Sequence, residues 1–183
     1  MKEADRLRRN SDMIAQLYDP MRQPVRGLLA DLSSMGFRPR IQQSYRSAQE
    51  QSELAAKGLS QRNFGFHNFD IEGVPAALAV DLVDDDDPIW PNDWQARASE
   101  ERDRRRRFVL CAAIYARRYG LSTGIGWGLE EKARAFLLDC VAAGMIRTDL
   151  AVGWDPLHVE PAGITVHEVR DGKWPTFNAA GGS

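Results

Sequence analysis

Apolar residues recur at helical spacing in several stretches of this 183-residue chain. In residues 21–35 they occupy positions i, i+3, i+4 and i+7, which is typical of an amphipathic helix. They are Val25, Leu28, Leu29 and Leu32. Weaker patterns predict three more helices, over residues 5–18, 99–119 and 129–143. In the last of these, the expected inner face consists of Leu129, Ala133, Phe136, Leu137, Cys140 and Val141.

Shorter apolar segments predict the strands, over residues 37–45 and 77–83. Between these strands, Ser47 and Glu50 form the Ser-x-x-Glu pattern of a capping box, which predicts a helix that ends near Gly58. The other segments are expected to be loop over 59–76 and strands with turns over 151–169. This order of elements predicts a single α+β domain.

The composition is that of an ordinary globular protein. Hydrophobic residues make up 43% and charged residues 27% of the chain, and the net charge is −2. This charge excludes a general attraction to nucleic acid or to an anionic membrane. No apolar run approaches the roughly 20 residues that span a bilayer, and the N-terminal residues lack the apolar core of a signal peptide. We therefore expect a monomer that is made in the cytoplasm without membrane insertion.

Several conspicuous residues are expected to have ordinary structural roles. The acidic run at 84–87 is interpreted as an exposed turn, and the arginines of 102–108 as the solvated face of a helix. Cys111 and Cys140 lie in apolar helical patterns without a CxxC pair, so both should be buried. His167 is interpreted as an ordinary strand residue.

Candidate chemistry concentrates in two short stretches. The first, "HNFDIEGVPAALAVDL", begins with His67 and places Asp81 inside an otherwise apolar strand. The second, "GWDPLHVE", places Asp155 three residues before His158. Because a proline follows Asp155, a helix is disfavoured there, and a turn is expected to bring the two side chains to one side of the chain.

Together, His67, Asp81 and His158 supply two imidazoles and one carboxylate. This donor set suits zinc at about 2.0–2.2 Å, and three protein ligands leave a fourth position open for water, as a catalytic site requires. Asp155 would act as the general base, taking a proton from that water and passing it to the departing amine. Glu160 shares a strand face with His158, where it either orients the imidazole or faces solvent.

Three ordered motifs resemble those of one protein family. They are "SYRSAQEQSELAAKG" (44–58), "HNF…LAVDL" (67–82) and "WDPLHVE" (154–160). They are similar to the Tyr-Arg-Ser, His-x-x-Gly-x-Ala-x-Asp and Asp-x-x-His or Glu-x-x-His motifs of the zinc D-Ala-D-Ala carboxypeptidase family. That family includes VanY-like enzymes and phage L-alanyl-D-glutamate endopeptidases, and Asp before the second histidine resembles the phage branch. The resemblance spans residues 25–165.

The resemblance implies a VanY- or hedgehog-like fold, with a small antiparallel sheet, flanking helices and a zinc site on the sheet. It also implies how the chain is divided. A metallopeptidase domain would cover residues 21–170, after an N-terminal helical arm at 1–20 and before a C-terminal tail at 171–183.

Residue roles follow from the same resemblance. The implied zinc ligands are His67, Asp81 and His158. Asp155 would be the catalytic carboxylate, and Arg46 would bind the substrate and stabilise the developing oxyanion. Tyr45 and Trp154 are expected to contact the substrate. Trp127 and Trp154 would either wall the substrate cleft or belong to the core.

The chain departs from the family pattern between the first histidine and the aspartate. Fourteen positions separate His67 from Asp81, where the family has seven. We interpret "DIEGVPA" as a loop insertion, since loops tolerate added length at little entropic cost. Asp70 and Glu72 lie inside it, so either could replace Asp81 as a ligand. Asp81 is preferred because a rigid apolar strand holds a ligand in place.

The sequence thus predicts a zinc-dependent peptidase that cuts the stem peptides of bacterial peptidoglycan, most closely an L-Ala–D-Glu endopeptidase of the endolysin type. It would act on the cell wall after release or export. Two alternatives stay open: a D-Ala-D-Ala carboxypeptidase on the same fold, and a non-catalytic module that binds cell-wall peptide.

Overall fold

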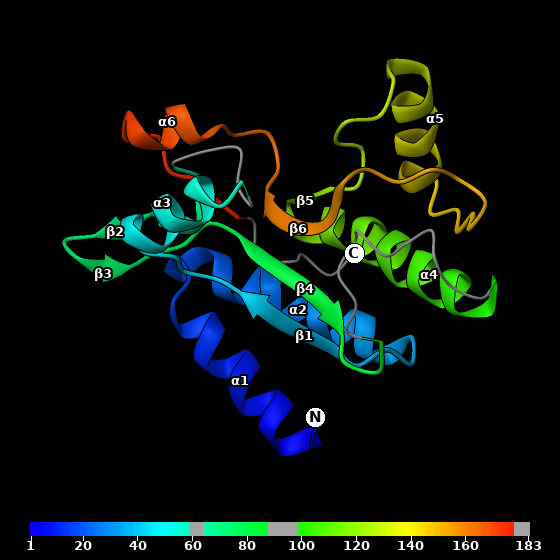
Figure 1. Ribbon diagram of the computed structural model, residues 1–183, viewed down its shortest axis with the longest axis horizontal. Coiled ribbons are helices and arrows are strands. Elements are labelled where there is room, and N and C mark those ends of the chain that lie inside the picture. The colour runs from blue at the N-terminus through cyan, green and yellow to red at the C-terminus, as the bar shows by residue number, and fades with distance from the viewer. Residues whose placement is uncertain (59–63, 88–98, 178–183) are drawn as a thin grey trace.

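The computed structural model describes residues 1–58, 64–87 and 99–177 (Figure 1). Residues 59–63, 88–98 and 178–183 lie outside the described residues, and they include parts of the predicted loop and of the predicted tail. Within the described ranges, no helix is both long and apolar enough to cross a membrane.

A four-stranded antiparallel sheet lies at the centre of the molecule, in the order β1-β4-β6-β5 (Figure 1). In that order the strands are Pro39–Gln43, Val80–Asp84, Asp155–Pro161 and Leu121–Gly124. The sheet therefore places β4, from the middle of the chain, directly beside β6 from its C-terminal part. The predicted α+β class, with a small antiparallel sheet and flanking helices, is confirmed.

Helices cover this sheet (Figure 1). The helices of the N-terminal half are α1 (Glu3–Ala15), α2 (Asp19–Ser34) and α3 (Ala48–Ala56). The others are α4 (Ser99–Ala116), α5 (Glu131–Ala142) and α6 (Val166–Arg170), with single 3-10 turns η1 (Phe66–Asn68) and η3 (Arg117–Tyr119). α2 packs against α4 and β1, and α4 also contacts β5 and β6. α1 lies against β1.

The core forms where the apolar stripe of α2 meets the inward side chains of the sheet. The four stripe residues predicted from the sequence are all buried, and so are Ile41 of β1 and Leu82 of β4. Burying one such aliphatic side chain stabilises the fold by about 1.5–3 kcal/mol. The face of the sheet toward α2 is therefore filled by apolar side chains. Because successive side chains of a strand point to opposite faces, the polar side chains between them lie on the other face.

The capping box predicted before α3 is present. The Ser47 hydroxyl accepts from the main-chain N–H of Glu50 at 3.2 Å, and the Glu50 carboxylate accepts from the N–H of Ser47 at 2.8 Å. These bonds satisfy two N–H groups that the first helical turn would leave unpaired. They set the start of α3 at Ala48, two residues after Arg46.

Two helical predictions were wrong in detail. α1 ends at Ala15, before the predicted end at residue 18. On α5, Ala133 and Phe136 were expected on the inner face but are exposed, and the buried residues of this helix are Leu137, Cys140 and Val141. Residues 166–170, where strands and turns were expected, form α6, because the Thr165 hydroxyl caps it by accepting from the N–H of Glu168. His167 therefore lies on a helix.

The acidic run at 84–87 turns at Asp85 and Asp86, as predicted, but only Asp86 is exposed. Asp84 and Asp85 are buried, and the guanidinium groups of Arg104 and Arg40 approach them at 2.9 and 2.8 Å. Arg104 and Arg105 of α4 are thus counter-ions of this run, while Arg107 is exposed as predicted. Cys111 and Cys140 are buried and free, as predicted.

Both predicted flanking segments contact the domain. Ile14 of α1 belongs to the buried core. In the C-terminal segment, the ring centroid of Trp174 lies 5.7 Å from that of Phe69, a buried residue of the domain. The division of the chain at residues 20 and 170 stays a prediction.

Candidate metal centre

The strand ladder between β4 and β6 brings Asp81 and His158 together. Val80 and Leu82 of β4 point into the core, so Asp81 between them points to the opposite face. Asp81 pairs directly with His158 of β6 in the antiparallel register. Side chains of such directly opposed residues share a face and lie within contact distance.

His67 reaches the same place from η1. Its neighbours Phe66 and Asn68 are both buried, and the carbonyl of Phe66 accepts from the N–H of Leu78 at 2.8 Å. This bond ties η1 to the chain that leads into β4. The fourteen positions between His67 and Asp81 therefore do not separate them in space.

The extra residues between His67 and Asp81 form a small hairpin that leaves the site and returns. Its strands are β2 (Asp70–Ile71) and β3 (Val74–Pro75), and Ala76 N–H donates to the carbonyl of Phe69 at 2.9 Å across its base. Asp70 and Glu72 are exposed, and the Asp70 carboxylate accepts from the N–H of Gly73 within the hairpin. Among the described residues, the only group of three or more such side chains that could hold a metal ion contains Asp81 and neither of these two acids.

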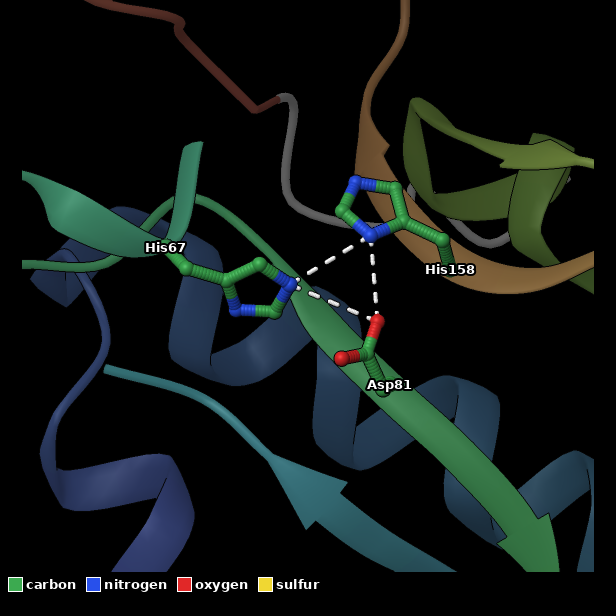
Figure 2. Close-up of side chains that lie close together, drawn as sticks. All are labelled: His67, Asp81 and His158. Carbon is green, nitrogen blue, oxygen red and sulfur yellow. Dashed lines mark hydrogen bonds and ion pairs between the residues drawn. The ribbon is translucent and has the colours of Figure 1, made fainter. Parts of the chain in front are cut away.

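Three donor atoms converge at the centre of the site (Figure 2). The Nδ1 of His158 lies 3.0 Å from the Oδ1 of Asp81. The Nε2 of His67 lies 3.3 Å from that oxygen and 3.3 Å from the Nδ1 of His158. Ligands of a tetrahedral ion at about 2.0 Å are separated from one another by about 3.3 Å. The group His67, Asp81 and His158 could therefore hold a metal ion.

The outer nitrogen of each imidazole has its own acceptor. The Nδ1 of His67 lies 2.5 Å from the main-chain oxygen of Ser44, and the Nε2 of His158 lies 3.2 Å from the Oε2 of Glu160. Because a carbonyl or carboxylate oxygen accepts, these outer nitrogens carry the protons. The inner nitrogens are then the ones that can present lone pairs to a metal. Glu160 thus orients His158, which was one of its two predicted roles.

The charges of the group favour a cation. Burial disfavours the charged forms of both His158 and Asp81. The hydrogen bonds from His158 to Asp81 and Glu160 nevertheless raise the pKa of His158 to about 10. The charge of His67 and the hydrogen bond with His158 hold the pKa of Asp81 below its usual value. The centre therefore takes up a proton readily, and a metal ion would replace that proton.

Asp155 is the first residue of β6, the strand that carries His158. It pairs with Gly124, although Thr123 pairs with Val159, so β6 bulges between Asp155 and Val159. The expected turn is thus a bulged strand. Burial raises the pKa of Asp155, and so does the charge of Asp81.

Arg46 also belongs to the site. Its Nη2 lies 3.9 Å from the Oδ2 of Asp81, whereas both histidines contact the Oδ1. Its Nη1 donates to the Oε1 of Gln51 at 2.8 Å. Sequence reasoning identified Arg46 from its motif but missed Gln51, which is buried in α3.

Two tryptophans connect the site to the surface. The ring centroid of Trp127 lies 5.1 Å from that of His158 and 5.5 Å from that of Trp154. Trp154 is 53% exposed, so it does not belong to the core. Tyr45 is half-buried and packs against the core. Contact of Tyr45 and Trp154 with a substrate stays a prediction.

The described contacts also reveal supports that the sequence did not indicate. The carbonyl of Ser44 is a main-chain group, so no residue type could signal its role. Asn68 donates to the carbonyl of Arg46 at 2.8 Å and accepts from the N–H of Gly65.

Comparison of the chain with family models, with curated proteins and with solved structures found no match.

Proposed function

We propose that this chain is a zinc-dependent peptidase of the zinc D-Ala-D-Ala carboxypeptidase family, which includes VanY-like enzymes, and that it hydrolyses the stem peptides of bacterial peptidoglycan. One observation carries the proposal. Donor atoms of His67, Asp81 and His158 lie within 3.3 Å of one another.

The donor set supports zinc as the metal. Two imidazole nitrogens and one carboxylate oxygen are ligands typical of catalytic zinc, and three protein ligands leave room for a fourth. A bound zinc ion would supply a polarised water molecule and a Lewis acid for the scissile carbonyl. His67 and His158 would each bind through the inner nitrogen, with the outer N–H held by Ser44 and Glu160.

Asp155 is the group that would move the proton. A carboxyl group transfers protons most effectively when its pKa lies near the working pH, and burial together with Asp81 shifts the pKa of Asp155 upward in that direction. Asp155 would take a proton from the attacking water and deliver it to the amine that leaves.

Arg46 would bind the substrate and the developing negative charge on it. Its guanidinium is permanently charged and stands beside the metal ligands. The substrate class follows from the resemblance of the Tyr-Arg-Ser, His and Asp-x-x-His motifs to the family. Asp at position 155 favours the L-Ala–D-Glu bond over the terminal D-Ala–D-Ala bond.

The decisive experiment is mass spectrometry of the fragments released from purified peptidoglycan by zinc-loaded protein. We expect fragments that begin with D-Glu, and we expect chelation of zinc to stop their release. The Asp155→Asn variant should retain zinc and release no fragment, whereas Asp139→Asn, on the exposed face of α5, should behave as the wild type.

Other outcomes would contradict the proposal in distinct ways. Release of D-Ala alone would identify a carboxypeptidase instead. Stoichiometric zinc without cleavage of any wall type would indicate a module that only binds wall peptide. Absence of zinc binding would exclude the metallopeptidase altogether.

A further inference from the structure

The Arg46 main chain is joined to the turn that carries His67. Arg46 N–H donates to the carbonyl of His67 at 2.9 Å, and the buried amide of Asn68 donates to the carbonyl of Arg46 at 2.8 Å. The ring of His67 lies against the carbonyl of Ser44, two residues before Arg46. The Cα of Arg46 is therefore held in a fixed position relative to a candidate metal ligand.

The long side chain of Arg46 needs an anchor of its own. An arginine side chain has about 2 kcal/mol of rotamer entropy to lose on being fixed. Its approach to Asp81, at 3.9 Å, exceeds hydrogen-bond distance. The hydrogen bond from the Nη1 of Arg46 to the Oε1 of Gln51 is 2.8 Å long. Gln51 is buried, with only 3% of its surface exposed.

The local structure explains why Gln51 can serve as this anchor. The capping box starts α3 at Ala48, and Gln51 N–H donates to the carbonyl of Ser47 at 3.0 Å, which places Gln51 in the first helical turn. Side chains of a helix lean toward its N-terminus. That end of α3 is where the chain leaves Arg46, so the amide of Gln51 is directed back toward the guanidinium.

The anchor is chemically suited to an arginine that must recognise a substrate. The amide oxygen of Gln51 accepts one N–H without adding a negative charge, so the guanidinium keeps its charge and its other N–H groups. We infer that Gln51 is a positioning residue for Arg46, which holds the guanidinium beside Asp81 for contact with the substrate. The inference rests on the proposed function, in which Arg46 binds the substrate.

The test compares Gln51→Leu, which removes the acceptor at similar size, with Gln51→Glu, which keeps an acceptor oxygen. The matched control is Gln49→Leu, on the exposed side of the same helix. In zinc-loaded protein, NMR of the Arg46 guanidinium should show slow rotation of its NH2 groups in the wild type, in Gln51→Glu and in Gln49→Leu. The rotation should be fast in Gln51→Leu, with zinc content unchanged.

Peptide hydrolysis provides the second measurement. Gln51→Leu should lower kcat/KM by about 10- to 100-fold, the usual effect of losing an outer support of a site, at a temperature where the variant is fully folded. In an Arg46→Lys background, Gln51→Leu should lower kcat/KM by less than about threefold, because the guanidinium that Gln51 positions is no longer present. Full additivity of the two substitutions would overturn the inference.

The two proposals fail in different ways. If the wild type hydrolyses wall peptide but Gln51→Leu does so equally well, or keeps a slowly rotating guanidinium, the positioning role is wrong and the peptidase stands. If no form hydrolyses any wall peptide while Gln51→Leu alone frees the guanidinium, the positioning role stands and the peptidase is wrong.

Discussion

At the scale of single residues, the two histidines turn different ring nitrogens toward the centre of the candidate metal site. His67 would bind through Nε2 and His158 through Nδ1, because Ser44 and Glu160 occupy the other nitrogens. The sequence predicted that these two histidines belong to the site. It could not predict which nitrogen of His67 faces the site, because that depends on the main-chain carbonyl of Ser44, 23 positions upstream.

The pKa of His158 predicts how metal binding responds to pH. In the metal-free protein, the pKa of about 10 means that this ring carries a proton on both nitrogens at neutral pH, and a metal can bind the Nδ1 only after the proton on that nitrogen leaves. We therefore expect metal affinity to rise about tenfold per pH unit between about pH 7 and pH 9. Titration calorimetry in buffers of different ionisation enthalpy should show release of about one proton per ion.

His167→Gln is the control for this measurement, because His167 lies exposed on α6. It should leave both the pH dependence and the proton release unchanged. In the metal-free protein, the raised pKa also stabilises the fold below the unfolded-state value of 6.5, and this stability is lost as the pH rises through about 10. A metal affinity that stays flat across this range would contradict the assignment of His158 as a ligand.

At the scale of the elements, the hairpin of β2 and β3 explains why an insertion can interrupt the predicted motif. The sequence correctly predicted that Asp81, on a strand, belongs to the group and that the loop acids do not. It predicted the inserted segment only as loop. The closure of this segment at its base, between Phe69 and Ala76, is a long-range feature without a sequence signal.

Removal of the hairpin tests this interpretation. Replacing residues 70–75 by Gly-Gly should preserve metal binding and change the free energy of unfolding by about 1 kcal/mol or less, because the chain is already joined at the base of the hairpin. Isothermal titration calorimetry with zinc measures the metal affinity, and urea denaturation measures the free energy of unfolding. This variant lacks Asp70 and Glu72, so retained affinity also excludes them as ligands.

Unlike the hairpin deletion, Asp81→Ala should disrupt metal binding. Loss of a ligand should weaken metal binding by more than about 100-fold, since loss of an outer support alone costs about 10- to 100-fold. If the hairpin deletion lowered metal affinity and Asp81→Ala did not, the choice of ligands would be wrong.

At the scale of the whole molecule, a cluster of opposite charges joins segments that are distant in sequence. The acidic run at the end of β4 pairs with Arg38 and Arg40 near β1 and with Arg104 and Arg105 of α4. Sequence reasoning treated the two charge runs separately, as solvated surfaces. Their pairing depends on the end of β4 lying close to Arg104 and Arg105 of α4, which only the packed core determines.

Removal of one charge from this cluster should destabilise the fold. Arg105 and Asp87 form a pair in which the arginine side chain is 6% exposed. Arg105→Ala leaves Asp87 without this partner, and we expect a loss of about 3 kcal/mol. The exposed neighbour Arg107 is the control, and Arg107→Ala should change stability by about 0.5 kcal/mol or less. Equal effects of both substitutions in urea unfolding would show that the pair does not stabilise the fold.

The sequence by itself determined the elements whose signals are local. The α2 stripe, the capping box of α3 and the apolar strand around Asp81 follow from residues within a few positions of one another. Such short-range patterns act before any tertiary contact forms, so they can be recognised from sequence. The three residues that converge in the candidate metal centre could also be chosen from the sequence, because only a few residue types can supply metal-binding donors.

Only the tertiary structure decided the geometry of the site. The distances between the three donors, the outer partners of the histidines and the anchoring of Arg46 by Gln51 all join segments far apart in the chain or depend on side-chain direction. These contacts form because the antiparallel pairing of β4 with β6 and the burial of η1 leave each side chain one position to occupy. No pattern within a single stretch of sequence contains that information.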